Sequence, residues 1–162
     1  MPKLSNYLWV LFISMLPIIE LRGAIPVAIG FNINPIAAYF LCVAGNMLPV
    51  PFILLFIRPV FSYLKKLPKI AKYIHKLENR AMDKSDKVQR YSFWGLALFV
   101  AIPLPGTGAW TGALIASLLD MRFKSTVLSV FIGVVAAGIV VTLVSTGAFA
   151  GVSVLRDLFF LR

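Results

Sequence analysis

Two long runs of the sequence carry no charged side chain, and these runs constrain the fold more than any other feature. The first includes the 22 residues from Ile36 to Ile57 and the second the 30 residues from Thr126 to Leu155. At about 1.5 Å of rise per residue, the shorter run makes about 33 Å of helix, enough to cross the hydrocarbon core of a bilayer. They predict transmembrane helices, which we place at residues 35–62 and 125–150.

Prolines and glycines refine these two predictions. Pro49 and Pro51 predict a kink in the first helix, because proline removes a backbone donor and leaves a carbonyl for neighbouring helices to satisfy. Gly147 and Gly151 indicate that the second helix ends before the charged C-terminal tail.

Composition supports a membrane location for the whole chain. Hydrophobic residues make up 60% of the 162 residues, too many for a water-soluble domain of this size. We therefore treat residues 1–162 as a single membrane domain. The formal net charge is +10, but the cations cluster beside apolar spans, so a nucleic-acid partner is not expected. We find no catalytic set, phosphate-binding loop or metal-ligand spacing, so we expect no enzyme activity and no cofactor.

Two further apolar segments are interrupted in the middle. Residues 4–31 are interrupted by ELRGAIP, Glu20 to Pro26, and residues 91–119 by PLPGTG, Pro103 to Gly108. The arms beside the second break would be only about 15 to 17 Å long as helices, which is about half a bilayer. Irregular backbone at membrane depth survives only where it packs on protein or lines a cavity. Each segment therefore predicts a re-entrant helical hairpin.

The stretch between the two halves, residues 64–90, is strongly basic. More than half of the 16 lysine and arginine residues of the chain lie there. Its apolar residues recur every three or four positions, which predicts an amphipathic helix on the membrane surface. The positive-inside bias places it in the cytoplasm, where anionic lipid headgroups would face it. The alternative is a solvated charged linker.

The order hairpin, span, hairpin, span predicts the fold class. It is an all-α integral membrane protein with two opposed re-entrant hairpins and two transmembrane helices in an inverted repeat, whose tips meet near the midplane. The basic amphipathic cytoplasmic helix joins the halves. A topology with four complete spans is the alternative, because the distribution of positive charge is similar in both.

The hairpin tips carry the candidate site. Helices that begin just after Gly23 and Gly106 would present unpaired N–H groups and positive dipole ends to the tips, so an anion is the expected ligand. Arg22 adds a guanidinium suited to phosphate or carboxylate. The candidate substrate-binding residues are Glu20, Arg22, Gly23, Asn46, Pro103, Pro105, Gly106, Thr107, Gly108, Trp110 and Thr111.

Glu20 also needs a role, because a carboxylate inside a bilayer costs about 2.5 to 3.5 kcal/mol on insertion scales. It could pair with Arg22, or it could take up protons and couple them to substrate movement. Each candidate also has a structural reading: an ion pair that neutralises the tip, a tight turn at PLPGTG, an interhelical contact for Asn46, and packing for Trp110.

ELRGAIP together with PLPGTGAWTGALIASLLDM, Pro103 to Met121, resembles the family of small multidrug export proteins of bacterial and archaeal membranes. That family is similar to the DedA and VTT superfamily, which is described by opposed re-entrant hairpins and implicated in moving lipids such as undecaprenyl phosphate, in some members with protons. The resemblance implies that Glu20 and Arg22 match the acid and arginine of the first hairpin. The second hairpin departs from that pattern, since Pro103, Pro105 and Thr107 stand where DedA proteins have arginines around a proline.

We therefore expect a transporter or flippase for an anionic lipid in the bacterial or archaeal cell membrane. The resemblance implies a polyprenyl phosphate as the lipid, with protons as a second partner. The alternatives are a proton-coupled exporter of drugs or small solutes, and a membrane scaffold whose basic face recruits other proteins. Small inverted-repeat proteins often pair, so a homodimer is also considered.

Overall fold

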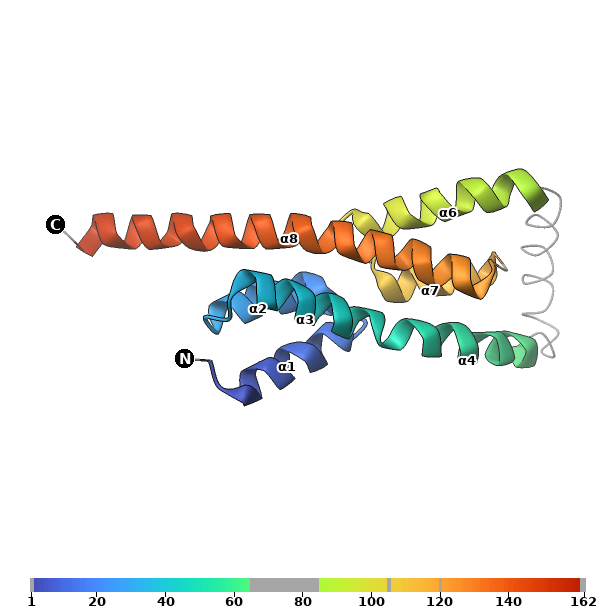
Figure 1. Ribbon diagram of the computed structural model, residues 1–162, viewed down its shortest axis with the longest axis horizontal. Coiled ribbons are helices and arrows are strands. Elements are labelled where there is room, and N and C mark those ends of the chain that lie inside the picture. The colour runs from blue at the N-terminus through green and yellow to red at the C-terminus, as the bar shows by residue number, and fades with distance from the viewer. Residues whose placement is uncertain (1, 65–84, 105, 120, 161–162) are drawn as a thin grey trace.

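The structure is a computed structural model that describes residues 2–64, 85–104, 106–119 and 121–160. Every regular element within these ranges is an α-helix, and Figure 1 shows the helices aligned roughly along one long axis. The helices are α1 (Leu4–Met15), α2 (Glu20–Gly30), α3 (Pro35–Met47), α4 (Pro49–Leu64), α6 (Ser85–Ala101), α7 (Ala109–Leu118) and α8 (Phe123–Phe160).

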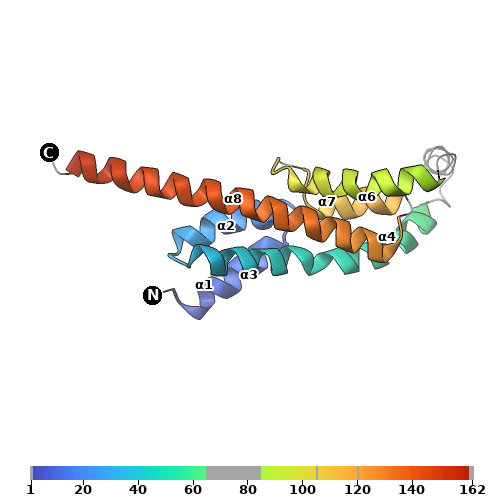
Figure 2. The same ribbon diagram turned by 45° about the horizontal axis from the view of Figure 1, so that its top comes forward.

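Two helix–turn–helix units point toward each other along this axis. Helices α1 and α2 are joined by residues 16–19 and lie side by side, and α6 and α7 are joined by residues 102–108. Figures 1 and 2 show that the two turns face each other near the middle of the molecule. With 12 and 11 residues, α1 and α2 are too short to cross a hydrocarbon core of about 30 Å.

Two longer apolar stretches run past these units. Pro35–Ile57 and Phe123–Gly151, with 23 and 29 residues, are long and apolar enough to cross a membrane. The first stretch is divided at Leu48, where α3 ends and α4 follows with Pro49. The predicted loss of helical hydrogen bonds lies at this division, since Pro49 and Pro51 offer no backbone donor, although Leu48 itself keeps helical angles, φ −57° and ψ −47°.

The second long helix extends further than the sequence predicts. The predicted span ends at residue 150, whereas α8 continues through Gly147 and Gly151 to Phe160, over 38 residues. Glycine weakens a helix interior by only about 1 kcal/mol, while backbone groups freed in an apolar environment cost several. The prediction that the glycines end this helix was therefore wrong. Figure 1 shows the C-terminal part of α8 extending past the other helices.

The first break also lies elsewhere than predicted. The sequence predicts it within Glu20 to Pro26, but α1 ends at Met15, residues 16–19 form a turn, and α2 begins at Glu20. Leu16 is extended, with φ −75° and ψ 138°, as expected for a residue before a proline, here Pro17. Pro26 lies inside α2 and does not end the helix. ELRGAIP is thus the start of a helix rather than its interruption.

The second break agrees with its prediction, since α6 ends at Ala101 and α7 begins at Ala109. The start of α7 is a little later than the expected position just after Gly106. Of the predicted basic helix at residues 64–90, residues 65–84 lie outside the described residues. The remainder, from Ser85 on, belongs to α6 and runs without a break into the arm that was predicted to begin at residue 91.

Small residues let the helices cross closely. A β-carbon added at Gly45 of α3 would overlap the Ser14 hydroxyl of α1, and one at Gly133 of α8 would lie 2.6 Å from the Ala97 carbonyl oxygen of α6. Close approach at small residues is characteristic of helix packing in membranes. Large apolar side chains face outward instead, among them Phe40, 65% exposed. This outer surface is suited to lipid.

Candidate functional site

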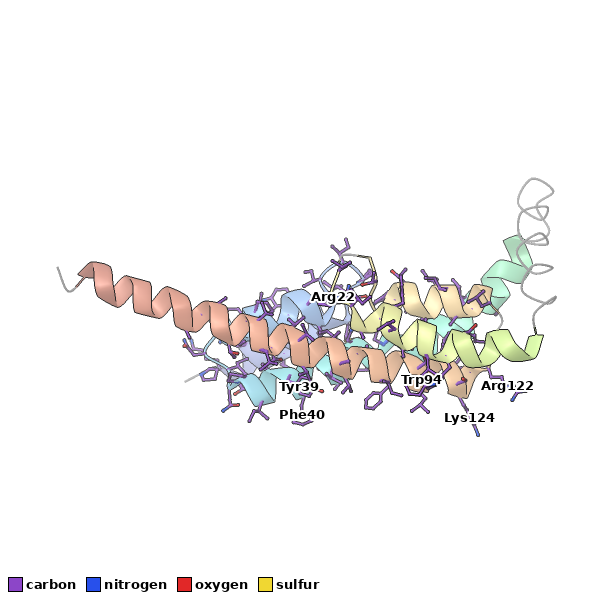
Figure 3. The ribbon with its side chains drawn as sticks, turned by 90° about the horizontal axis from the view of Figure 1, so that it is seen from above. Arg22, Tyr39, Phe40, Trp94, Arg122 and Lys124 are labelled. Carbon is purple, nitrogen blue, oxygen red and sulfur yellow. The ribbon has the colours of Figure 1, made fainter. Side chains whose placement is uncertain are left out.

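The two turns meet through side chains that the first turns of α2 and α7 supply. Arg22 is in α2, and in Figure 3 it lies where the turns after α1 and α6 come together. Its side chain is 16% exposed and that of Glu20 is 6% exposed. Both side chains contact groups that lie 80 to 90 positions further along the chain, and these contacts join the two units in the middle of the molecule.

The Arg22 guanidinium binds the end of α6 and the turn that follows it. One terminal nitrogen, Nη1, donates to the carbonyl oxygen of Leu104. The other, Nη2, donates to the carbonyl oxygens of Ile102 at 3.1 Å and Val100 at 3.5 Å, and to Thr107 Oγ1 at 2.9 Å. Carbonyls at the end of a helix carry partial negative charge and have no helical donor, so a cation is favoured there. Arg22 thus acts as a C-terminal cap for α6.

The Glu20 carboxylate occupies the opposite kind of helix end. Its Oε1 accepts from the backbone N–H of Trp110, in the first turn of α7, at 3.4 Å. The N-cap residue of α7, Gly108, has no side chain that could accept this bond. A β-carbon added at Gly108 would overlap the Glu20 carboxylate. The carboxylate thus takes the place of an N-cap side chain, and its Oε2 lies 3.7 Å from Arg22 Nη1.

The backbone of Glu20 is strained. Its φ is 51°, in the left-handed region that residues with a β-carbon rarely adopt. Such a conformation costs about 1 to 3 kcal/mol and persists where the surroundings enforce it, often at functional sites. The buried carboxylate is therefore aimed at α7 at the expense of backbone strain.

Trp110 forms a second helix cap between the two units, in which the second unit provides the donor and the first unit provides the carbonyl oxygen. Its indole Nε1 donates to the carbonyl oxygen of Met15, the last residue of α1, at 2.9 Å. Arg22 of the first unit binds the end of α6, and Trp110 of the second unit binds the end of α1. Each unit thus caps the first helix of the other. The sequence predicts substrate binding or packing for Trp110, and this hydrogen bond was not predicted.

Five of the predicted residues come together at this contact: Glu20, Arg22, Thr107, Gly108 and Trp110. The other predicted residues have different positions. Pro103 and Gly106 are exposed on the turn, where the φ of 85° at Gly106 suits glycine. Gly23 packs against Ile19 within the first unit.

Three predicted residues remain. Asn46 is 1% exposed near the end of α3, and its Oδ1 makes no hydrogen bond to the part of the chain that the structure describes. Thr111 is half-buried in α7. Pro105 lies outside the described residues.

The expected anion site differs from what the geometry presents. The sequence predicts that the starts of two helices face an external anion, but α2 begins at Glu20 rather than after Gly23, and the start of α7 faces the Glu20 carboxylate. The carbonyl oxygens that hold Arg22 were missed as well. They belong to apolar residues such as Leu104, whose side chains give no sign of a polar role for their backbone.

Metal ligands do not gather here. Within the described ranges, no group of three or more His, Cys, Asp and Glu side chains lies together.

The fold and the site define the class of protein. Helices of spanning length, an apolar outer surface and an interior contact between opposed turns are features of an α-helical membrane protein. The family follows from a comparison with family models. Residues 20–140 match the model described as "Putative small multi-drug export protein", which covers more than half of the chain and includes Glu20, Arg22 and the turn at residues 102–108. The chain belongs to this family. Searches of the curated proteins and of the solved structures return no match.

Proposed function

We propose that this protein is a transporter, not an enzyme, which moves an anionic amphipath across the cell membrane when its two turns separate. In this proposal the two helix–turn–helix units are re-entrant hairpins that enter from opposite leaflets. The observation that carries the proposal is the contact of Glu20 and Arg22 with the turn at residues 102–108, halfway along the molecule. Charged groups at such a depth are costly and usually serve ion or substrate movement.

An inverted repeat is supported by equivalent contacts in the two halves. Gly45 of α3 packs against α1, the first helix of the first unit, and Gly133 of α8 packs against α6, the first helix of the second. The reciprocal caps formed by Arg22 and Trp110 follow the same pattern. In inverted-repeat transporters, the site lies between the repeats near the midplane, and access alternates as one repeat moves against the other.

The amphipathic nature of the substrate is supported by the surroundings of the contact. Apolar side chains of both turns are exposed beside it, with Ile18 94% and Leu104 56% exposed. A polar site with an exposed apolar rim suits a molecule whose charged head binds at the turns while its chain stays in lipid. An anionic lipid, and within that class a polyprenyl phosphate as the DedA resemblance implies, is the substrate that we propose.

We also propose a coupling ion, an orientation in the membrane and an oligomeric state. Protons are the proposed coupling ion, with Glu20 as the group that carries them. The basic residues 64–90 face the cytoplasm under the positive-inside bias, and the protein works as a single chain or a homodimer. We also propose that this protein is related to the DedA and VTT superfamily.

The transport test uses the purified protein in proteoliposomes with a fluorescent polyprenyl phosphate. We expect movement of the lipid across the bilayer, slowed about tenfold or more by Arg22→Gln, since this removes the charge that faces an anionic head. The matched control is Arg122→Gln, at an exposed arginine just before the first residue of α8. Equal rates for the wild type and Arg22→Gln would contradict the proposal.

The topology test labels single cysteines from each side of the membrane. The only cysteine, Cys42, is buried, so Cys42→Ala provides the background. In our proposal, Arg122→Cys is labelled from the cytoplasmic side and Lys3→Cys from the outer side. Labelling of Arg122→Cys from outside would indicate four complete spans and would overturn the re-entrant hairpins.

Export of drugs is the second candidate function, favoured by the family description and by a buried carboxylate of the kind that binds cations. It predicts that the proteoliposomes move a cationic dye, that Glu20→Gln stops this movement, and that Arg22→Gln has little effect on it. The geometry favours an anion, because Arg22 lies 3.7 Å from the carboxylate and would repel a cation.

A further inference from the structure

We infer that the Glu20 carboxylate is an internal occupant of an anion site, and that the oxyanion of a substrate binds by replacing it. This inference rests on the proposed function and specifies how the site works. The start of α7 and Arg22 are both suited to an anion, and a carboxylate already lies between them. In this state the protein supplies that anion itself.

The donors of the site come from both units. They are the Trp110 backbone N–H of the second unit and the Arg22 guanidinium of the first, while the Thr107 hydroxyl accepts from Arg22 Nη2 at 2.9 Å and donates to backbone carbonyl oxygens of its own turn. One donor is unused, since Arg22 Nε is buried and makes no hydrogen bond within the described ranges. A buried donor of this kind normally has a partner. An incoming oxyanion can offer Arg22 more oxygen acceptors than the Glu20 carboxylate offers in this structure. One of these oxygens can accept a hydrogen bond from the unused Nε.

Glu20 is held more loosely than Arg22. Its hydrogen bond from Trp110 is 3.4 Å long and its distance to Arg22 is 3.7 Å, both beyond the ordinary range for charged pairs. Arg22 instead donates to Thr107 and Ile102 at 2.9 and 3.1 Å. The left-handed backbone at Glu20 also relaxes if its side chain leaves. When an oxyanion replaces the carboxylate, Glu20 is therefore the group that moves, and Arg22 stays at the end of α6 until the turns separate.

The space at the site limits the ligand. The Glu20 carboxylate rests directly against the α-carbon of Gly108, where even a methyl group would overlap it. Only a compact oxyanion fits between this residue and Arg22. The chemical class is a carboxylate or a phosphate monoester, present either as a free ion or as the head of a lipid.

Anion binding to the purified full-length protein in detergent tests this inference. Trp9→Phe and Trp94→Phe, both at exposed positions, leave Trp110 as the single tryptophan of three, and its fluorescence reports binding. The probes are inorganic phosphate and acetate. An internal occupant lowers apparent affinity by the fraction of molecules in which the site is free, so Glu20→Ala should bind the probes about tenfold or more tighter than the background protein. Adding Arg22→Gln should abolish binding.

A second substitution tests the location of the site. In the Glu20→Ala background, Gly108→Ala places a methyl group in the vacated space and should weaken binding about tenfold. Gly95→Ala should not change it, because a β-carbon added there lies more than 4 Å from its neighbours among the described residues. Glu20→Gln keeps the shape of the occupant without its charge, so its affinity should lie between the wild type and Glu20→Ala. Thermal unfolding of each variant checks that it is folded.

Dodecyl phosphate distinguishes a lipid head from a free ion. Tighter binding of dodecyl phosphate than of inorganic phosphate to Glu20→Ala assigns the site to a lipid, and equal binding assigns it to a free anion. If Glu20→Ala binds no better than the background protein, or if Gly108→Ala has no effect, the inference is wrong. Binding is measured in detergent, so a failure of lipid transport with anion binding intact would overturn the proposed function alone.

Discussion

The two turns that meet in the middle of the molecule contribute different chemistry. The first unit brings charged side chains, Glu20 and Arg22, at the start of α2. The second unit brings mainly backbone: the carbonyl oxygens of Ile102 and Leu104 and the N–H group of Trp110. The contact therefore pairs the Glu20 carboxylate with the partly positive start of α7. It pairs the Arg22 guanidinium with the partly negative end of α6.

This difference has a consequence for mutation. A side chain of the first unit can be removed by one substitution, while the backbone groups of the second can be altered only by changing the space or the conformation around them. Variants of the first unit should therefore have large electrostatic effects, and variants of the second unit smaller steric ones. The following predictions test this contrast.

Arg22→Gln should have the largest effect on stability. It leaves the Glu20 carboxylate buried without its cation, and breaking a buried pair by removing one partner costs about 3 to 5 kcal/mol. The free energy of unfolding can be followed by thermal denaturation in detergent. The double variant Glu20→Gln with Arg22→Gln should recover part of the loss, because no unpaired charge remains. An additive double variant would show that the two side chains act independently.

Gly45→Ala and Gly133→Ala should each destabilise the protein by about 1 to 3 kcal/mol, the usual cost of overpacking. The added methyl groups would lie 2.9 Å from the Leu11 carbonyl oxygen and 2.6 Å from that of Ala97, and backbone moves less readily than a side chain. Similar losses at both positions would strengthen the equivalence of the two halves. A loss at only one of them would contradict it.

Gly108→Ala should cost less stability, about 1 kcal/mol, because the overlapping group is the end of a flexible side chain that can move. Its displacement should still weaken the contact between the turns. Proteolysis or hydrogen exchange at residues 102–108 should therefore increase. Gly95→Ala is the control, and the same increase in that variant would remove the role that we assign to Gly108.

Trp110→Phe should have the smallest effect. It removes the hydrogen bond to the Met15 carbonyl oxygen but keeps an aromatic ring, so the loss should be about 1 kcal/mol. Trp94→Phe, at a position 66% exposed, should change the unfolding midpoint less. If the two variants lose equal stability, the cap of α1 by Trp110 contributes nothing of its own.

Much of the architecture could be predicted because it depends on local patterns. The length of an uncharged run sets whether a helix can span a bilayer, and the prolines at 49 and 103 mark points where helical hydrogen bonds are lost. Where several local signals compete, the prediction was less accurate. Leu16 and Pro17 broke the first helix, whereas the more conspicuous Glu20, Gly23 and Pro26 did not.

The partners of the charged residues could not be predicted in the same way. The sequence shows that Glu20 and Arg22 are costly at membrane depth and must be compensated, since both signs of charge lie in one apolar segment. Whether the compensation comes from each other, from a ligand or from a helix end depends on groups 80 to 90 positions away.

The sequence by itself determined the helical class, the presence of two stretches long enough to span a bilayer and the presence of two interrupted segments, because these follow from hydrophobicity and from the chemistry of proline and glycine. Only the tertiary structure decided that Arg22 caps α6, that Glu20 occupies the start of α7 and that Trp110 caps α1. Backbone carbonyl and N–H groups are present at every residue, so a sequence does not show which of them lie free at a helix end and within reach of a charge.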